Sequence, residues 1–397
     1  MSSIPLYGSA GLRPVADQAG WSLPAWTYED PDFMKLELAK VWRRAWQLVC
    51  HVSDIPDPGD WQSFRMMGEL AIVVRGRDGT IRAFHNVCRH RAARLLDGDY
   101  GNCGGRILCP YHAWSFGLDG ALLGVPFIEE YENFDKADYG LTPVEHAVHA
   151  GFVYIRFEPG GPSLADEMAP IAEEAGIYRF EELQQLYPVR TRIREVNWKN
   201  ACDNYVDALH VRVAHPGLDS LVRETYTLSV DRGVDKIFAS VDLPNRAGPS
   251  VELYRRLLPH VDHLPAERQK MWTYFRLFPG LMFDVYPDQI DFMQFIPLTP
   301  TTCILRDAAY ALPDDRREMK LARYLNIRIN RDVNREDKGL IERVQDGMAS
   351  SSFTAGPLGR NEICLRNFAE RMRREIPLAR ERQRPGRDRL DAALAEN

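Results

Sequence analysis

The sequence predicts an α+β protein, with a small all-β domain followed by a larger domain that combines an antiparallel sheet with helices. The first observation is that residues 46–162 consist of short strand-like stretches separated by turn glycines. The second is that the residues after 163 form runs of strands and then a helical final third, an order typical of α+β folds. A chain of 397 residues, 45% of them hydrophobic, is long enough for two or three domains with buried cores.

Residues 1–45 are expected to form a helical segment that packs on the larger domain. From Asp32 to Trp46, apolar residues recur among charged ones as in an amphipathic helix. Residues 1–20 have neither the basic nor the apolar stretch of a secretion signal, and no apolar run approaches the roughly eighteen residues of a membrane span. The sequence therefore predicts a cytoplasmic protein that does not act in a membrane.

Two short motifs in the small domain, at residues 88–90 (Cys-Arg-His) and 109–112 (Cys-Pro-Tyr-His), each offer one thiolate and one imidazole. A Rieske-type two-iron, two-sulfide cluster needs this set, because two thiolates bind one iron and two imidazoles bind the other. A structural zinc site is the alternative, but zinc motifs usually pair cysteine with cysteine and histidine with histidine. Here cysteine precedes histidine in both halves. The predicted ligands of a Rieske cluster are Cys88, His90, Cys109 and His112.

The residues around these motifs complete the small domain. Strand-like stretches at 70–74 and 81–87 lead into the first motif, and the run 160–162 (Gly-Gly-Pro) is expected to end the domain. Cys103 lies between the motifs but has no histidine at the matching spacing, so we expect it not to bind the cluster. The cysteines outside the motifs have no disulfide-framework spacing and are expected to be reduced thiols. They are Cys50, Cys103, Cys202, Cys303 and Cys364.

The larger domain is expected to span residues 163–380. The charged tail at 381–397 is expected to be a solvated or frayed helix rather than a binding patch. The larger domain begins with a helical pattern at 165–176. Strand-like stretches follow at 189–198, 226–243, 271–286 and 290–312. Aromatic residues in the third and fourth stretches could line a pocket for an arene or surround a quaternary ammonium group, although most are expected to be core residues of the sheet. They are Trp272, Tyr274, Phe275, Phe278, Phe283, Tyr286, Phe292 and Phe295.

A second metal-binding pattern lies within residues 197–216. If this stretch is helical, Asp203, Asp207 and His210 lie on one face, at positions i, i+4 and i+7. His215 lies about 140° further around an ideal helix than His210, so the helix must distort or end before both imidazoles can reach one metal. Two histidines and one carboxylate form the facial triad of non-haem iron sites, which leaves positions open for dioxygen. For Asp203, a hydrogen-bonding role is as good an explanation as a direct one.

The motif CRHR…CPYHAWSFGLDG resembles that of the Rieske non-haem iron oxygenases, the large (alpha) subunits of ring-hydroxylating dioxygenases and the related monooxygenases and demethylases. The resemblance extends from about Trp26 to about Phe368. It implies a Rieske domain followed by a helix-grip-like catalytic domain that binds a mononuclear Fe(II). It also implies that Asp337 completes the triad, because Asp337 matches the family's carboxylate ligand. Glu336 and Asp332 are the alternatives that the sequence leaves open.

The resemblance also implies how the two metal centres are connected. In the family, an aspartate bridges an iron-bound histidine and a cluster histidine of the neighbouring subunit. Asp207 matches this residue, so the expected bridge runs from His112 of the partner subunit through Asp207 to His210. Head-to-tail contacts of this kind close only as rings, which implies a homotrimer.

These features predict the terminal oxygenase component of a Rieske system. It would use O2 as a mono- or dioxygenase, in ring hydroxylation as in aromatic catabolism or in oxidative demethylation, on a small aromatic or quaternary-ammonium substrate. The chain has no dinucleotide-binding G-x-G-x-x-G after a strand and no ferredoxin cysteine run, so NAD(P)H-derived electrons must come from a separate reductase, with or without a ferredoxin. A net charge of −6 gives no reason to expect nucleic acid as a partner. The alternative function is an electron-transfer Rieske protein without oxygen chemistry.

Overall fold

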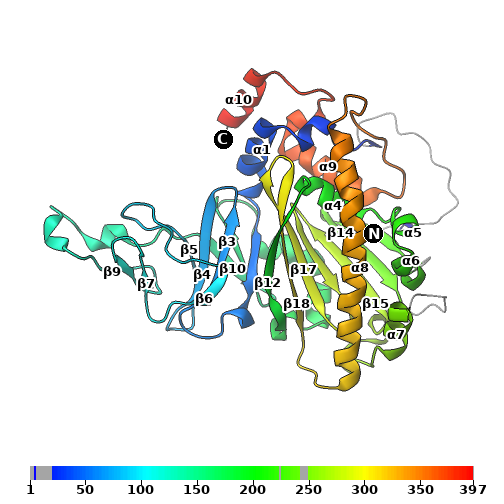
Figure 1. The fold of residues 1–397 in the computed structure, drawn as a ribbon, viewed down its shortest axis with the longest axis horizontal. Helices are drawn as coiled ribbons and strands as arrows, with labels where there is room; N and C mark the ends of the chain where they lie inside the picture. The colour runs from blue at the N-terminus through cyan, green and yellow to red at the C-terminus, as the bar shows by residue number, and fades with distance from the viewer. Residues whose placement is uncertain (1–3, 6–19, 223–224, 242–248, 397) are drawn as a thin grey trace. The chain divides into compact units, whose positions relative to one another are not determined.

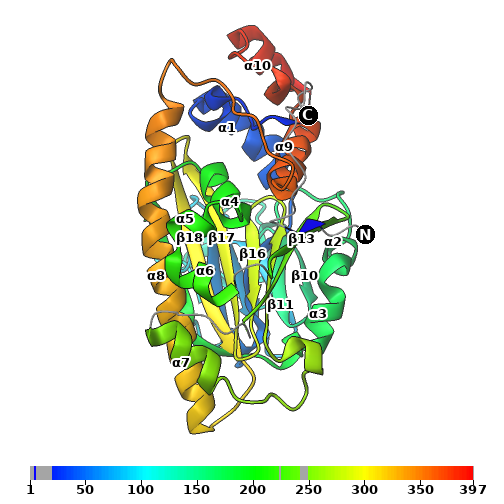
Figure 2. The same ribbon diagram turned by 90° about the vertical axis from the view of Figure 1, so that its right-hand side faces the viewer.

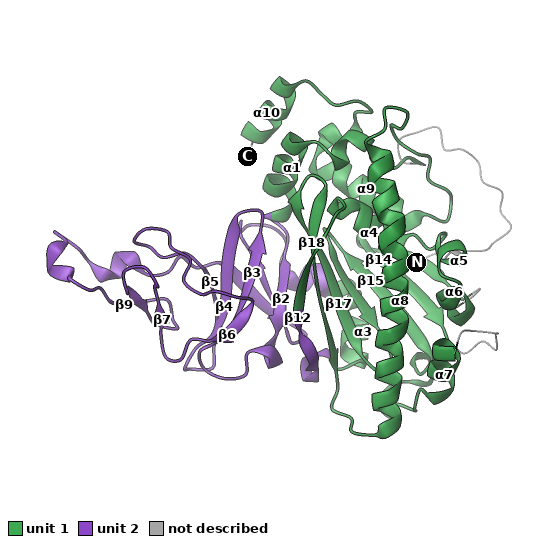
Figure 3. Ribbon diagram, in the orientation of Figure 1, with its two compact units in different colours: residues 1–42, 169–179, 190–397 green, residues 43–168, 180–189 purple. Residues whose placement is uncertain are grey.

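The computed structural model describes residues 4–5, 20–222, 225–241 and 249–396. The chain forms two compact units (Figure 3). The small unit comprises residues 43–168 and 180–189, and the large unit comprises residues 1–42, 169–179 and 190–397. The chain therefore leaves the large unit after residue 42 and returns to it twice.

The small unit, all of whose residues are described, is built from antiparallel strands in three sheets. The strand orders are β10-β11-β2, β5-β4-β3-β6 and β7-β8-β9. The strands are β2 (Gln47–His51), β3 (Asp60–Met66), β4 (Glu69–Arg75), β5 (Ile81–His85), β6 (Tyr100–Asn102), β7 (Ile107–Leu108), β8 (Ser115–Phe116), β9 (Leu122–Gly124), β10 (Glu145–His149) and β11 (Phe152–Arg156). The unit is all-β apart from short helical segments such as α2 (Leu164–Met168).

The small unit is longer than the predicted 46–162, because contacts at its ends hold further residues. The buried guanidinium of Arg156 stacks over the Trp46 ring at 4.4 Å and donates to the carbonyl oxygen of Pro162 at 2.9 Å. The run that was expected to separate the domains is therefore fixed within the unit. The buried His51 ring lies with Nε2 3.0 Å from the carbonyl oxygen of Phe180, which holds the segment 180–189 against the same unit.

The described part of the large unit is organised around an antiparallel sheet of eight strands, in the order β1-β13-β14-β15-β16-β17-β18-β12 (Figures 1 and 2). The strands are β1 (Ile4–Pro5), β12 (Gln184–Arg194), β13 (Thr227–Asp231), β14 (Val234–Ser240), β15 (Met271–Leu277), β16 (Leu281–Val285), β17 (Ile290–Thr299) and β18 (Thr302–Ala311). β12 starts in the returning segment of the small unit, five residues earlier than the predicted start at 189.

Each of the other three predicted strands is a hairpin of two strands. Within 226–241, Arg232 and Gly233 have φ values of 47° and 88°, and this pair of left-handed residues turns β13 directly into β14. Residues 242 and 243 of that prediction lie outside the described residues. The stretches 271–286 and 290–312 divide in the same way, into β15–β16 and β17–β18. The hydrophobic pattern found the strands but not the turns between them.

Helix α8 (Arg317–Met348) runs along the sheet (Figures 1 and 2), and its first half buries one side chain every three or four residues. Helix α4 (Trp198–Val206) contacts β17, β18 and α8, and α6 (Pro216–Val222) contacts β14 and α8. The residues that join α4 to α6 are therefore held between the sheet and α8. The unit also contains α3 (Ala172–Ile177), α5 (Val211–Ala214), α7 (Pro249–Leu257) and α9 (Ile363–Glu375). No helix in the described residues is long and apolar enough to cross a membrane.

The first helix and the final segment pack together in the large unit. Asp30 caps α1 (Pro31–Glu37) by accepting from two backbone N–H groups, and a π-helical turn continues the helix to residue 42 rather than to 46. Arg384 pairs with Asp30 and with Asp32. Helix α10 (Arg387–Ala395) contacts α1 and buries Leu390 completely. Most side chains of residues 381–396 are exposed, and Leu390 together with Arg384 attaches this segment to α1.

Candidate metal centres

The two cysteine–histidine motifs form a matching pair of loops. Cys88 follows β5 and Cys109 follows β7. In each loop the cysteine carbonyl oxygen accepts from the N–H of the alanine four residues later, Ala92 or Ala113, at 3.1 Å. Both alanines have a φ of 56°, in the left-handed region, where the chain can turn back sharply. The loops therefore present their ligands in the same way, although the spacing from cysteine to histidine differs by one residue.

The two histidines of these loops lie side by side. The ring centroids of His90 and His112 are 4.6 Å apart, and Trp114 stacks on His90 while Tyr111 packs on His112. The Nδ1 atom of each histidine is buried without a hydrogen-bond partner in the described part of the chain. Burial lowers the pKa of His90, which keeps its imidazole neutral and able to bind a metal.

The donor set of the loops fits a Rieske cluster. Cys88 and Cys109 are buried in the hydrophobic core of the small unit, with Trp61 and Phe84 among its members. Two buried thiols and two unpartnered imidazole nitrogens are the four donors that such a cluster takes. Buried nitrogens without partners are costly unless something binds them. Cys103 instead directs its thiol to the carbonyl oxygen of Gly59, at 3.3 Å.

The helix expected around His210 is broken. Helix α4 ends at Val206, and Asp207 has an extended conformation with φ −77° and ψ 100°. Helix α5 follows His210, and α6 begins directly after His215. The chain thus distorts before His210 as well as after it, so Asp203, Asp207 and His210 do not share one helix face. Because the helix is broken, the imidazoles of His210 and His215 can approach the same point although they are five residues apart.

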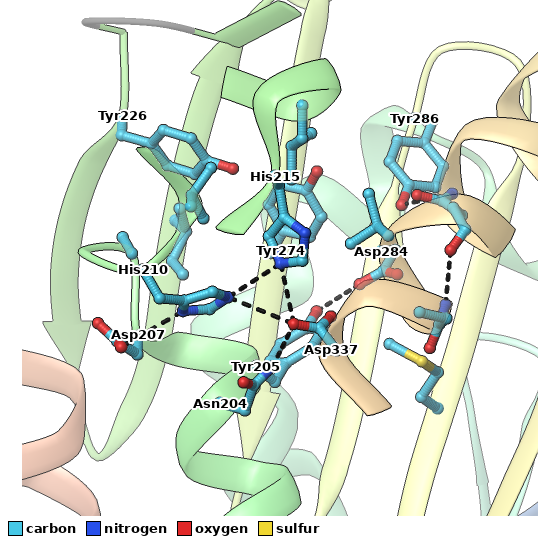
Figure 4. Close-up of a pocket in the computed structure, with 18 residues that line it drawn as sticks. Asn204, Tyr205, Asp207, His210, His215, Tyr226, Tyr274, Asp284, Tyr286 and Asp337 are labelled. Carbon is cyan, nitrogen blue, oxygen red and sulfur yellow. Dashed lines mark hydrogen bonds and ion pairs between the residues drawn. The ribbon is translucent and has the colours of Figure 1, made fainter. Parts of the chain in front are cut away.

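Three ligand atoms converge at this break (Figure 4). The Nε2 atoms of His210 and His215 are 3.1 Å apart, and Oδ1 of Asp337, from α8, lies 2.9 Å from His215 Nε2 and 3.4 Å from His210 Nε2. Metal–ligand bonds of about 2.1 Å at right angles place neighbouring ligand atoms about 3.0 Å apart. The observed triangle therefore has the dimensions of one face of an octahedral metal site, as a facial triad requires.

Neighbouring groups hold each of these side chains from behind. The Nδ1 atom of His215 lies 2.7 Å from Oε2 of Glu336, and the Nδ1 atom of His210 lies 3.3 Å from Oδ2 of Asp207. Asn204 donates from Nδ2 to Asp337 Oδ1 at 2.8 Å. The Glu336 carboxylate, which is within hydrogen-bond distance of the second ring nitrogen of His215, favours the tautomer in which Nε2 is free for a metal, whereas Asp207 makes only an ion-pair contact with His210.

Charges at the centre suit a divalent cation. Burial opposes the charged form of His210, but contacts with Asp207 and Asp337 outweigh it and raise the pKa of His210 to about 9. Burial likewise opposes ionisation of Asp337, yet contacts with His210 and His215 hold its pKa below the usual range. Asp337 is therefore a carboxylate at neutral pH, with two imidazoles that would exchange their protons for a metal ion.

The other acidic candidates lie elsewhere. Glu336 reaches the far nitrogen of His215 rather than the centre of the triangle. Asp332 pairs with Arg335 on the solvent side of α8. Asp203 accepts from the hydroxyl of Tyr28 at 3.0 Å, and its carboxylate lies 4.0 Å from the guanidinium of Arg276. Asp203 thus has the hydrogen-bonding position that the sequence offered as one of its two explanations.

The three converging residues line a cavity with about 620 Å³ of empty space, which includes its mouth. Of the eight aromatic residues considered in the sequence, Tyr274 and Tyr286 line it, and Tyr205 and Tyr226 join them. Sequence analysis missed Tyr205, Tyr226, Asp284 and the asparagines at 204, 330 and 334. No local signal distinguishes Asp284 from other strand residues, because the fold alone turns it inward.

Family comparisons match both units. The Rieske [2Fe-2S] domain matches residues 45–135, and the ring hydroxylating alpha subunit (catalytic domain) matches residues 180–377. The chain belongs to the Rieske non-haem iron oxygenases. Its small unit is accordingly a Rieske domain that binds a two-iron, two-sulfide cluster, and its large unit is a catalytic domain that binds mononuclear iron.

Among individual proteins, the chain is 30% identical over 344 residues to the carnitine monooxygenase oxygenase subunit of Acinetobacter baumannii, a match that covers 84% of this chain and 86% of that one. It is 37% identical over 210 residues to the protein of the same name from Escherichia coli strain K12. That match covers 52% of this chain and 55% of the relative, so the chain spans about half of the relative's length. A solved quaternary ammonium Rieske monooxygenase shares the fold, with a TM-score of 0.78 at 23% identity over 92% of this chain and all of that one.

Proposed function

We propose that this protein is the terminal oxygenase of a multi-component system that inserts oxygen into a small organic substrate. The observation that carries this proposal is the triangle of His210, His215 and Asp337 beside a cavity, in a chain that also contains a Rieske domain. A plain electron-transfer Rieske protein needs neither the triangle nor the cavity. When bound, an iron ion with open coordination positions supplies the activation of dioxygen.

In this proposal, Cys88, His90, Cys109 and His112 bind the cluster, and His210, His215 and Asp337 bind the iron. Glu336 positions His215, and Asn204 positions the Asp337 carboxylate. The chain offers no hydride-transfer site of its own among the sequence motifs, so a separate reductase supplies the electrons, with or without a ferredoxin.

The route between the metals is proposed to cross between subunits of a homotrimer, with Asp207 as its bridge. The distance of 3.3 Å from Oδ2 of Asp207 to Nδ1 of His210 supports one side of this bridge, and His112 of the partner subunit would be the other. Apolar side chains are exposed beside both ends: Tyr111 is 56% exposed next to His112, and Val213 is 85% exposed shortly after His210. Surfaces of this kind are covered when a second copy binds head to tail.

The substrate class proposed for the cavity is an N-methylated ammonium compound. The relatives named above act on carnitine, and tyrosine faces line the cavity of this chain. In the reaction that we propose for this chain, one oxygen atom enters a methyl C–H bond and the other leaves as water, with two electrons and two protons from the donor system. The hydroxymethyl product can then lose formaldehyde, which completes a demethylation.

Metal analysis of the purified protein tests the proposal. We expect three irons per chain, two in the cluster and one at the triad, whereas an electron-transfer protein would contain two. His210→Ala, His215→Ala and Asp337→Ala should each keep the red-brown cluster colour and lose the third iron. Glu336→Gln is the matched control, because it changes the neighbouring carboxylate and should retain most of the iron. If Glu336→Gln loses the iron and Asp337→Ala keeps it, the assignment of the carboxylate is wrong.

Oxygen uptake with a surrogate reductase tests the activity. We expect uptake that is coupled to formaldehyde release with N-methyl ammonium compounds, and uptake without product for arenes and methyl ethers. Coupled hydroxylation of an arene would instead place the protein with the ring-hydroxylating enzymes. Iron at the triad without coupled uptake for any compound would contradict the proposed reaction.

A further inference from the structure

The cavity beside the triad contains an acidic residue that the metal chemistry does not use. Asp284, on β16, lines the cavity and is 6% exposed. It lies opposite Tyr274 of β15 in the sheet register and opposite Asp291 of β17 on its other side. Directly paired residues point to the same face of a sheet, so the Tyr274, Asp284 and Asp291 side chains form a row across three strands.

The Asp284 carboxylate has hydrogen-bond donors but no cation. Tyr205 donates its hydroxyl hydrogen to Oδ1 of Asp284 (Figure 4), and Tyr286 provides a further hydrogen bond. In the part of the chain that the structure describes, no lysine or arginine forms an ion pair with Asp284 or Asp291. Burial raises the pKa of Asp284 to about 6, which leaves it mainly ionised at neutral pH. A buried carboxylate without a counter-charge is costly, and a cationic ligand would remove that cost.

Tyrosine rings lie beside this carboxylate. The Tyr205 and Tyr274 rings meet edge to face at a centroid distance of 6.3 Å, and Tyr274 meets Tyr286 in the same way at 6.1 Å. Tyr226 lines the cavity as well. Ring faces attract an ammonium group that is close to them, more strongly where water is excluded. Rings and carboxylate together therefore provide a site for a cation rather than for a neutral arene.

The described lining of the cavity contains no arginine or lysine that could pair with a substrate carboxylate. Its polar members are asparagines, aspartates, tyrosines and the two histidines of the triad, and none of its described residues is lysine or arginine. A zwitterion such as a betaine carries a carboxylate that would have to leave water without an arginine or lysine partner, next to Asp284. Like charges that are brought together in a low-dielectric site repel strongly.

We propose that Asp284 is the counter-charge for the substrate's ammonium group, and that the cavity selects ammonium compounds that carry no anionic group over zwitterions and over neutral compounds. This inference rests on the proposed function, since it concerns the substrate of the same site. The triad lines the same cavity, so an ammonium group held at Asp284 keeps its N-methyl groups in the space where oxygen would be activated. Asp284 is thus a specificity residue, separate from the metal ligands.

Binding measurements on the iron-loaded protein without oxygen test this proposal. Calorimetry would compare choline, glycine betaine and the neutral carbon analogue of choline, in which a tert-butyl group replaces the trimethylammonium group. These ligands have similar shapes and differ in charge. We expect wild-type protein to bind choline at least about tenfold more tightly than either of the others. Equal affinity for choline and its neutral analogue, or tighter binding of betaine, would overturn the proposal.

Two variants assign the preference to Asp284. Asp284→Asn keeps the shape and the acceptor for Tyr205 but removes the charge, and should abolish the preference for choline over the neutral analogue. Asp288→Asn is the control, because Asp288 is also buried and accepts from a tyrosine hydroxyl, that of Tyr254 at 2.6 Å, but does not line the cavity. It should retain the preference. Asp284→Asn protein that keeps iron and the wild-type preference would disprove the role of this residue.

The two experiments distinguish an error in the role of Asp284 from an error in the proposed oxygenase function. If cations bind through Asp284 but no compound gives coupled oxygen uptake, the charge selection stands and the oxygenase function fails. If coupled uptake occurs with neutral or zwitterionic compounds and binding does not depend on Asp284, the function stands and the inference fails.

Discussion

Asp207 lies beside the proposed iron ligands but is not one of the three residues whose ligand atoms converge. Helix α4 stops directly before it, so its carboxylate is free to reach Nδ1 of His210 instead of lying along a helix surface. Its other oxygen, Oδ1, accepts from the N–H of Leu209 at 2.9 Å, which fixes the side chain in place. The Asp207 side chain is 25% exposed, as the proposed contact with a partner subunit's histidine requires.

Replacement of Asp207 separates a bridge from a ligand. Asp207→Ala should keep all three irons, because each ligand nitrogen and oxygen is retained, while electron transfer to the third iron falls at least about tenfold. Single-turnover kinetics of pre-reduced protein would follow cluster oxidation by absorbance. Asp207→Asn, which still accepts a hydrogen bond, should recover part of the rate. Wild-type cluster oxidation in the alanine variant would refute the bridge, and loss of the third iron would make Asp207 a ligand.

At the scale of elements, the segment around helix α1 and the segment that leads to helix α10 are joined by direct contacts. Trp26 donates from its ring N–H to the carbonyl oxygen of Glu381 at 2.8 Å, and Arg384 reaches the aspartate that caps α1. Leu390 is the one buried side chain of helix α10. The attachment of the helix should therefore depend strongly on that side chain.

Removal of the Leu390 side chain tests this attachment. Leu390→Ala should lower the free energy of opening of α10 by about 2–3 kcal/mol, because a fully buried leucine loses its contacts and leaves a cavity. Hydrogen exchange of the α10 amides would measure the change. Leu321→Ala on α8 is the control, since Leu321 is 40% exposed and should alter local exchange by less than about 0.5 kcal/mol. Unchanged protection of α10 in the Leu390 variant would mean that the ion pairs alone hold it.

At the scale of the whole molecule, the proposed function needs more than one chain. Complementation between inactive variants tests whether electrons cross between subunits. His112→Ala should lack an intact cluster and Asp337→Ala should lack the third iron, so neither is active alone. Mixed trimers obtained by co-expression with two tags should recover activity, because the cluster of one subunit serves the iron of the next. Mixed trimers that assemble but stay inactive would contradict the inter-subunit route.

A second pair of mixed trimers tests whether activity returns only when the two defects lie on opposite sides of the electron route. Asp207→Ala and Asp337→Ala both damage the accepting side of the route, so their mixed trimers should remain inactive. Asp207→Ala mixed with His112→Ala should recover activity, since the defects lie on opposite sides of one interface. Recovery in the first mixture would place Asp207 on the donating side instead.

The sequence by itself determined the chemistry of this protein. The order of cysteine and histidine in the two cluster motifs is encoded over a few residues, and a cluster accepts few other donor sets. The α+β class and the strand positions also followed from local patterns, because alternation of apolar residues reports which side chains are buried. His210 and His215 could be proposed together because they are close in sequence.

Only the tertiary structure decided which distant residues lie beside His210 and His215. The sequence left Asp337, Glu336 and Asp332 open, since all three lie on one helix, and the contact of α8 with α4 brings Asp337 to the histidines while Glu336 reaches the far side of His215. Asp284 became a candidate for the same reason. Its neighbours in the chain are ordinary strand residues, and only the folded sheet decides that no described lysine or arginine pairs with it. Charge and burial are properties of the assembled site, so no local pattern could have supplied them.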